Sequence, residues 1–143
     1  MAVELESLGR SVKQLQYRHH RAMERGLAPL GTTFVQWDAL RAIANNPGAS
    51  AHALALETFQ SDQSFGTLAT RLEVRGLIER APGGGRKIEH RLSAQGERML
   101  AAGRPVLAGV AKTSFAPLSE QERATLLELL SRVLAEPAPG DEG

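Results

Sequence analysis

The chain has 143 residues, of which 42% are hydrophobic and 23% are charged, as expected for one globular domain with at most a small appended element. It contains no cysteine, which excludes disulfides, zinc sites built on thiolates and redox sensing by cysteine. The formal net charge is only +1, so overall charge gives no support for nucleic-acid binding and local patterns must carry that argument.

Hydrophobic residues recur at helical spacing near the start of the chain. They predict one long helix over residues 3–25, which Gly26 and Pro29 end. Thr33 and Gln36 have the spacing of a capping box and predict the start of a second helix. The apolar stripe of the first helix consists of Leu5, Leu8, Val12, Leu15, His19 and Met23.

Two further helices follow, separated by a turn of only a few residues. The Asn-Asn-Pro-Gly sequence at 45–48 ends the second helix, and Ser50 is a good N-cap for a third helix over residues 51–58. Ser61 caps a fourth helix that ends at Gly76, a residue type suited to the left-handed conformation at a helix end. Its inner face carries Phe65, Leu68, Ala69 and Leu72. Two helices joined by so short a turn predict a helix-turn-helix.

The segment after Gly76 has the pattern of a β-hairpin. Residues 77–80 are predicted as one short strand, and the alternation from Lys87 to Leu92 predicts the other. The Ala-Pro-Gly-Gly-Gly sequence at 81–85 is predicted as the flexible loop between them. A hairpin in this position is the wing of a winged helix.

Two more helices are predicted after the hairpin. Ser93 caps a fifth helix that continues to about Phe115, and the Ser-Glu-Gln-Glu sequence at 119–122 is a capping box that opens a sixth. The broad apolar face of the sixth helix consists of Leu126, Leu127, Leu130, Val133 and Leu134. The predicted fold class is mainly α with a small β-hairpin wing: a winged helix-turn-helix with additional helices at both ends.

This order of elements, together with five local strings, is similar to one known family. The strings are GTTFVQWDAL at 31–40, ALA at 53–55, RLEVRGLIER at 71–80, RLSAQG at 91–96 and LSEQER at 118–123. They resemble the MarR family of winged helix-turn-helix transcriptional regulators over roughly residues 5–134. One departure lies in the wing, where that family usually has an Asp two residues before an Arg. Here Gly84 stands two residues before Arg86, so the residue that would orient this arginine is missing.

The resemblance implies how the chain is divided. It implies an N-terminal dimerisation helix at 1–30, a winged helix-turn-helix lobe that binds DNA at 31–93 and C-terminal dimerisation helices at 94–135. The tail at 136–143 is predicted to be disordered from its own composition, which includes Pro137, Pro139 and Gly140. A homodimer would hold two recognition helices about one DNA turn apart, roughly 34–36 Å, to match a pseudo-palindromic operator. The residues alone leave an intrachain three-helix bundle as the alternative, and the resemblance favours the homodimer.

The outer face of the fourth helix and the wing are the candidate surface for double-stranded DNA. Gln can bond adenine in a bidentate manner, Thr can touch a thymine methyl, and Arg can reach guanine or phosphate. Basic wing residues can neutralise phosphates or enter the minor groove, and the alternative is that they are simply solvated. The candidates are Ser61, Gln63, Ser64, Thr67, Thr70 and Arg71 in the helix, and Arg86, Lys87 and Arg91 in the wing.

The resemblance also implies a small-molecule effector, because MarR-type proteins often release DNA when a small aromatic or phenolic acid enters a cleft beside the DNA-binding lobe. Arg or neutral His can bind a carboxylate or phenolate next to an apolar wall. The candidates are Arg18, His19, His20, Trp37 and Arg41. A place in the core is the alternative for Trp37, and a satisfied position in a helix interface is the alternative for His19.

Other classes of function have little support in the sequence. His19 and His20 point to different sides of a helix, and the remaining histidines lack carboxylates at useful spacing, so no metal site is predicted. No catalytic or phosphate-binding motif occurs, so we expect neither an enzyme nor a cofactor. No signal peptide is evident and no apolar segment approaches the roughly 18 residues of a membrane span, so we expect a cytoplasmic protein without a membrane partner.

The sequence therefore predicts a dimeric, sequence-specific transcriptional regulator that binds double-stranded DNA, a repressor released by a small ligand. The alternative is a winged-helix module for protein interaction with weak or no DNA binding, which the missing wing Asp and the low net charge favour.

Overall fold

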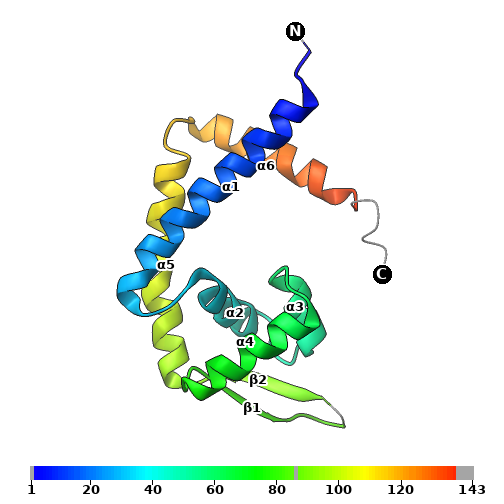
Figure 1. Ribbon diagram of the computed structural model, residues 1–143, viewed down its shortest axis with the longest axis vertical. Coiled ribbons are helices and arrows are strands. Elements are labelled where there is room, and N and C mark those ends of the chain that lie inside the picture. The colour runs from blue at the N-terminus through cyan, green and yellow to red at the C-terminus, as the bar shows by residue number, and fades with distance from the viewer. Residues whose placement is uncertain (1, 86, 138–143) are drawn as a thin grey trace. The chain divides into compact units, whose positions relative to one another are not determined.

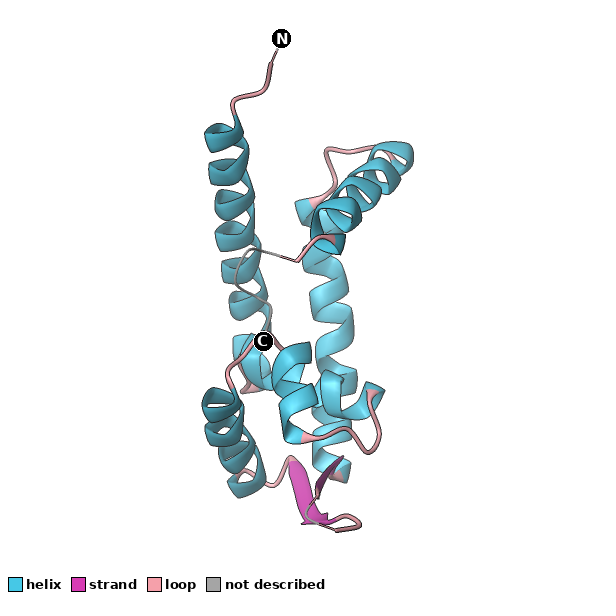
Figure 2. Ribbon diagram, turned by 90° about the vertical axis from the view of Figure 1, so that its right-hand side faces the viewer, coloured by secondary structure: helices cyan, strands magenta, loops and turns pink. Residues whose placement is uncertain are grey.

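The computed structural model describes residues 2–85 and 87–137. Helices make up most of these residues, and two strands form one antiparallel hairpin (Figure 1 and Figure 2), which confirms the predicted fold class. The elements are α1 (Leu5–Leu27), η1 (Ala28–Leu30), α2 (Phe34–Asn45), α3 (Ala51–Glu57), α4 (Asp62–Val74), β1 (Ile78–Pro82), β2 (Ile88–Leu92), α5 (Ala94–Ser114) and α6 (Glu120–Ala135). The chain divides into two compact units, Met1–Val110 and Ala111–Gly143, so the boundary falls near the end of α5. The predicted division at residues 30, 93 and 135 stays a prediction.

Serine side chains begin several helices at the predicted residues. Ser50 accepts a hydrogen bond from the backbone N–H of Ala53 at 3.1 Å, and Ser61 accepts one from Ser64 at 3.1 Å. Ser119 begins α6 with a complete capping box, in which the Glu122 carboxylate accepts a hydrogen bond from the Ser119 N–H at 2.9 Å. These bonds satisfy backbone donors that a helix start leaves open.

The predicted capping box at the start of α2 is only half formed. Thr33 accepts a hydrogen bond from the backbone N–H of Gln36 at 3.2 Å, as predicted. The Gln36 side chain instead accepts hydrogen bonds from the Thr32 hydroxyl and from the guanidinium of Arg75, the C-cap residue of α4. Arg75 also donates to the backbone oxygen of Gly31 at 2.7 Å. Gln36 and Arg75 therefore tie the end of α4 to the start of α2.

Two predicted boundaries are wrong. Gly26 does not end the first helix, because α1 continues through it to Leu27. A Cβ at Gly26 would lie 2.6 Å from Cγ1 of Val106, so the glycine lets α1 and α5 come close. In the hairpin, β1 extends to Pro82, which pairs with Ile88, so the loop is shorter than predicted.

The core of the first unit forms where α2, α3, α4 and the start of α5 meet the hairpin. The inner face predicted for α4 is buried, with Phe65, Leu68, Ala69 and Leu72 all in the core. Trp37 is only 5% exposed, and its indole N–H donates to the backbone oxygen of Leu100 at 3.1 Å. The tryptophan therefore joins α2 to α5 as a core residue.

Two helices leave apolar side chains uncovered in the single chain. In α1 the exposed residues include Leu5, Leu8 and Val12. In α6, which belongs to the second unit, none of its residues is buried, and Leu127 and Leu134 are 67% and 79% exposed.

Candidate nucleic-acid interface

Five of the six helix residues predicted to contact DNA lie on the outer face of α4, the sixth, Ser61, is its N-cap, and each is exposed. Gln63, Ser64, Thr67 and Arg71 come together along one shallow pocket of about 360 Å³, which Val35 of α2 also borders. Because the buried residues hold the opposite face of the helix in the core, this face points away from the domain. The geometry suits a helix that enters a groove of a duplex.

Several hydroxyl groups on this face already donate within α4. Ser61 donates to the Ser64 hydroxyl at 2.9 Å, Thr67 to the backbone oxygen of Gln63 at 3.1 Å, and Thr70 to that of Gly66 at 3.1 Å. A threonine whose hydroxyl already donates in this way can still offer DNA its methyl group. The hydroxyl oxygen can also still accept a hydrogen bond. The longer side chains of Gln63 and Arg71 are then the donors best suited to base edges.

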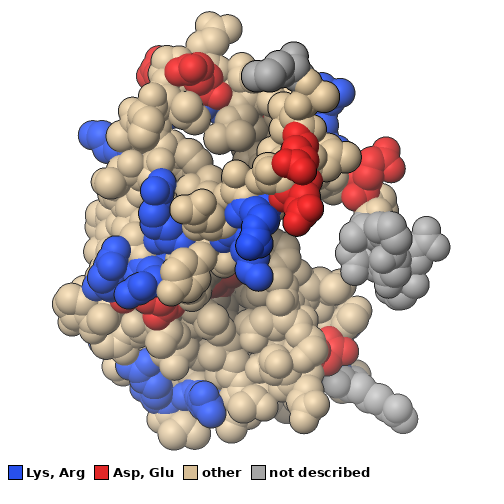
Figure 3. All heavy atoms as spheres, turned by 45° about the horizontal axis from the view of Figure 1, so that its top comes forward, with Lys and Arg blue, Asp and Glu red and all other residues tan. Residues whose placement is uncertain are grey.

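In the wing, β1 and β2 pair in register from Ile78 with Leu92 to Pro82 with Ile88. Lys87 is exposed directly before β2. Arg91 is exposed too, but its guanidinium bonds the Glu89 carboxylate at 3.1 and 3.2 Å, so part of its charge is compensated. Figure 3 shows Lys and Arg side chains on the same face as Asp and Glu side chains, in keeping with the net charge of +1. Arg86, the remaining predicted wing residue, lies outside the described residues.

Arg80 is a residue of this surface that the sequence did not single out. From β1 its Nε and Nη2 donate to the two carboxylate oxygens of Glu73 in α4 at 3.2 and 3.1 Å, and Nη2 also donates to the Thr70 hydroxyl at 3.3 Å. These hydrogen bonds hold the pKa of Glu73 below its ordinary value. Arg80 thus links the wing directly to the candidate recognition helix.

His90, opposite Arg80 in the hairpin, packs beneath the same junction. It is 7% exposed, and its ring lies edge-on to Phe65 of α4 with 5.9 Å between the centroids. Its Nδ1 is buried without a hydrogen-bond partner among the described residues. Burial, with a further contribution from the charge of Arg80, lowers the pKa of His90, while Glu73 acts weakly in the opposite direction.

Comparisons with known proteins bear on this arrangement. A model of the MarR family matches residues 30–87, which include α2, α3, α4 and β1. The transcriptional regulator HosA from Escherichia coli O111:H- is 29% identical to this chain over 125 residues, covering 86% of this chain and 91% of HosA. The chain is thus similar to the MarR family in its helix-turn-helix and to HosA over most of its length. It is therefore related to transcriptional regulators.

Solved MarR-family structures share the fold of this chain. A mutant of MarR from E. coli, solved in complex with operator DNA, has a TM-score of 0.84 and 23% identity, and the match covers 90% of this chain and 94% of that one. A MarR family protein from Mycobacterium tuberculosis, solved in complex with p-aminosalicylic acid, has a TM-score of 0.73 and 22% identity, with coverage of 88% and 97%. At these identities the likeness shows the winged-helix fold.

The residues predicted to bind an effector are held in different ways. Arg18 is exposed and His19 is half-buried on α1. His20 lies 3.8 Å from the Glu24 carboxylate and edge-on to Phe34 at 5.9 Å. The indole N–H of Trp37 is used in the core, as described above.

Arg41, the fifth effector candidate, is engaged within the protein. Its guanidinium bonds Asp38 at 2.7 Å and Glu57 at 3.5 Å. It lines a pocket of about 320 Å³ beside Phe34 and Phe59, and the other four candidates do not line that pocket. Of the five candidates, this pocket therefore takes in Arg41 alone.

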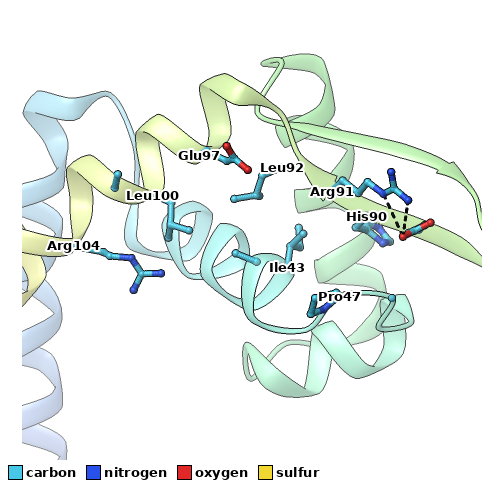
Figure 4. A pocket seen from close by; sticks show the side chains of 12 residues that line it. Ile43, Pro47, His90, Arg91, Leu92, Glu97, Leu100 and Arg104 are labelled. Atoms are coloured by element: carbon cyan, nitrogen blue, oxygen red, sulfur yellow. Dashed lines mark hydrogen bonds and ion pairs between the residues drawn. The ribbon is translucent and has the colours of Figure 1, made fainter.

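A larger pocket of about 600 Å³ lies where the end of α2, strand β2 and the first half of α5 meet (Figure 4). Arg91 and Arg104 line it together with Glu89 and Glu97, so the lining has no net charge with which to select an anion. The dashed lines in Figure 4 mark the bonds that already join Arg91 to Glu89. The sequence did not predict this pocket.

Within the described residues no helix is long and apolar enough to span a membrane, and no group of three or more His, Asp or Glu side chains is arranged to hold a metal ion.

Replacing His90 by Phe is expected to remove an acid-sensitive part of the stability. Because folding lowers the pKa of His90 below its ordinary 6.5, the unfolded chain binds the proton more readily, and stability present above that pH is lost as the pH falls below it. The phenyl ring keeps the contact with Phe65 and removes an unsatisfied nitrogen, so stability at pH 7.5 should be unchanged or higher by up to about 1 kcal/mol. Urea unfolding of the wild type and the variant at pH 7.5, 6.0 and 5.0 would measure the stability at pH 7.5 and its loss on acidification. An equal loss in the two proteins at low pH would contradict the assignment to His90.

Proposed function

We propose that this chain is a homodimeric transcriptional regulator that binds double-stranded DNA sequence-specifically in the bacterial cytoplasm and represses transcription at a pseudo-palindromic operator. The observation that carries the proposal is the exposed face of α4, where Gln63, Ser64, Thr67 and Arg71 come together on a helix held by the core. The shared fold with E. coli MarR, which was solved with operator DNA, supports the same use of this face.

Each residue of the surface then has a role in the proposal. Gln63 reads adenine, Arg71 reads guanine or contacts phosphate, and Thr67 and Thr70 offer methyl groups to thymine. Ser61 and Ser64 lie at the start of α4, where backbone N–H groups favour a phosphate. In the wing, Lys87 contacts the phosphate backbone, with Arg86 and Arg91 as its partners in that role.

The proposed homodimer accounts for the uncovered apolar faces. Leu5, Leu8 and Val12 in α1 are exposed, and so are Leu127 and Leu134 in α6. Contiguous exposed apolar side chains on a single chain mark an interaction surface. A second copy that covers them gives a twofold arrangement, which matches the symmetry of a palindromic site.

We further propose that a small aromatic acid releases the DNA. The support is the related protein from M. tuberculosis that was solved with p-aminosalicylic acid. Arg18, His19 and His20 on α1 are the candidates that a carboxylate would meet first, since Trp37 lies in the core. Arg41 is bonded to Asp38 and Glu57, so it could bind the effector only after these bonds are broken.

Binding of the purified protein to the DNA beside its own gene tests the proposal. We expect tight binding that weakens steeply between 50 and 200 mM salt, since neutralised phosphates release counterions. The double variant Gln63→Ala/Arg71→Ala should lose about 100-fold in affinity, because each good base contact contributes about 1–3 kcal/mol. Arg98→Ala, which removes an exposed arginine from α5, is the matched control and should bind like the wild type. Salicylate added to the complex tests the effector.

A protein-interaction module is the second candidate function, favoured by the near-neutral charge and by arginines already paired with Glu73 and Glu89. Absence of DNA binding even at low salt would support it and would end the regulator proposal. Binding that is equally tight to unrelated duplexes would argue against sequence-specific recognition.

A further inference from the structure

One bidentate ion pair joins the wing to α4 at the surface, above the buried core that the two elements share. The Arg80 guanidinium meets both carboxylate oxygens of Glu73 at 3.1 and 3.2 Å, and the two side chains are 25% and 41% exposed. A fork of two parallel hydrogen bonds fixes direction as well as distance, which a single ammonium contact does not. The contact thus adds a directional constraint on the angle at which β1 leaves the helix, above the core packing of Ile78.

The same guanidinium engages a residue of the proposed reading face. Its Nη2 donates to the Thr70 hydroxyl at 3.3 Å, and that hydroxyl itself donates to the backbone oxygen of Gly66 at 3.1 Å. The orientation of Thr70 on α4 is therefore coupled to the position of Arg80 on β1.

The position of Lys87, the proposed phosphate contact, depends on the orientation of the hairpin. Arg80 pairs with His90 near the base of the hairpin, and Pro82 pairs with Ile88 farther out. Lys87 precedes Ile88 in the chain, so its location relative to α4 depends on the angle of the whole hairpin. Below the ion pair, His90 contacts Phe65, and Ile78 is buried in the same core cluster as the inner face of α4.

We propose that Arg80 is a positioning residue: through Glu73 and Thr70 it sets the wing relative to α4, so that Lys87 meets the phosphate backbone when α4 occupies the groove. This role rests on the proposed DNA-binding function: Arg80 does not contact the DNA itself but acts through the position of Lys87. An ion pair this exposed contributes little to stability, so its value lies in geometry and the domain should fold without it.

Glu73→Gln is the sharpest variant, because simple electrostatics and positioning predict opposite results. Removing a negative charge near DNA should strengthen binding if Glu73 acts only through its charge. If Glu73 holds Arg80, affinity should instead fall about fivefold, and the salt slope should decrease by about 2 as the Lys87 contact of each protomer is lost. Glu79→Gln, which removes the same charge from an exposed residue of β1, is the matched control and should not weaken binding.

A double-mutant cycle on the operator completes the test. Lys87→Ala is expected to weaken binding about fivefold in the wild type and hardly at all in the Glu73→Gln background, since the lysine is already misplaced there. Arg80→Lys, which keeps the charge and loses the fork, should behave like Glu73→Gln. Thermal unfolding of each variant checks that it is folded.

The outcomes separate this inference from the proposed function. Two results would overturn the positioning role while the wild type still binds its operator. One is a double variant whose loss of affinity equals the product of the losses caused by Glu73→Gln and Lys87→Ala alone. The other is tighter binding by Glu73→Gln. A wild type that binds no DNA would overturn the proposed function, and the positioning role with it.

Discussion

Replacing Gly96 by alanine is expected to lower the free energy of unfolding by about 3 kcal/mol, as for severe overpacking at a buried site. Gly96 lies in the first turn of α5, where its N–H donates to the Ser93 hydroxyl at 3.0 Å. A Cβ there would lie 3.0 Å from the carbonyl carbon of Leu77 and closer still to its oxygen. That oxygen cannot easily move, because it accepts a hydrogen bond from the Ser93 N–H at 3.0 Å. The close approach sets α5 against the start of the wing.

Gly109→Ala is the matched control on the same helix. A Cβ at Gly109 meets nothing within 4 Å, so only helix propensity changes, and stability should rise by up to about 1 kcal/mol. Urea unfolding followed by circular dichroism measures both variants, at one protein concentration because dimerisation would couple to folding. Equal stability of the two variants would mean that the contact with Leu77 relaxes without cost.

Local signals in the sequence were enough to predict most element boundaries. A serine cap bonds a backbone N–H three residues later, so Ser50, Ser61 and Ser119 could be recognised without any tertiary information. The buried face of α4 follows in the same way from helical periodicity, and Phe65 and Leu72 lie in the core as predicted.

Contacts between distant residues could not be predicted in this way. Gly26 has the propensity to end a helix, but the approach of Val106, eighty positions later, gives it a place inside α1. Gln36 has the right spacing for a capping box, yet the guanidinium of Arg75 competes for its side chain. Tertiary packing overrode the local preference in both cases.

The candidate site divides along the same line. The exposed positions of α4 could be predicted, whereas the hydrogen-bond and ion-pair partners of each side chain within the protein could not. The hydroxyl of Thr70 is engaged by Arg80, and Arg91 is compensated by Glu89, because hairpin register and rotamers decide these pairs. An arginine at the end of a predicted strand gives no sign that it reaches back to a helix.

The double variant Leu127→Glu/Leu134→Glu is expected to weaken the proposed dimer at least about 100-fold, since full burial of each leucine contributes about 1.5–3 kcal/mol. The exposure of both side chains in the single chain means that the substitutions remove no core packing there. Leu127 also borders an apolar pocket of about 430 Å³ that Phe115 and Leu130 line, a hollow suited to an apolar side chain from a second copy. Thr125→Glu, which adds one charge to another exposed position of α6, is the control.

Sedimentation velocity over a range of concentrations gives the assembly state, and operator binding gives its consequence. We expect the leucine variant to sediment as a folded monomer and to bind the operator far more weakly, because a monomer engages one half-site at a time and loses the gain from linkage. The Thr125→Glu protein should remain a dimer. If the leucine variant stays dimeric, α6 does not form the interface, and the exposed stripe of Leu5, Leu8 and Val12 on α1 becomes the surface to test next. If it is monomeric yet binds the operator with undiminished affinity, the reading face of α4 acts alone, and the twofold symmetry proposed for the site has to be abandoned.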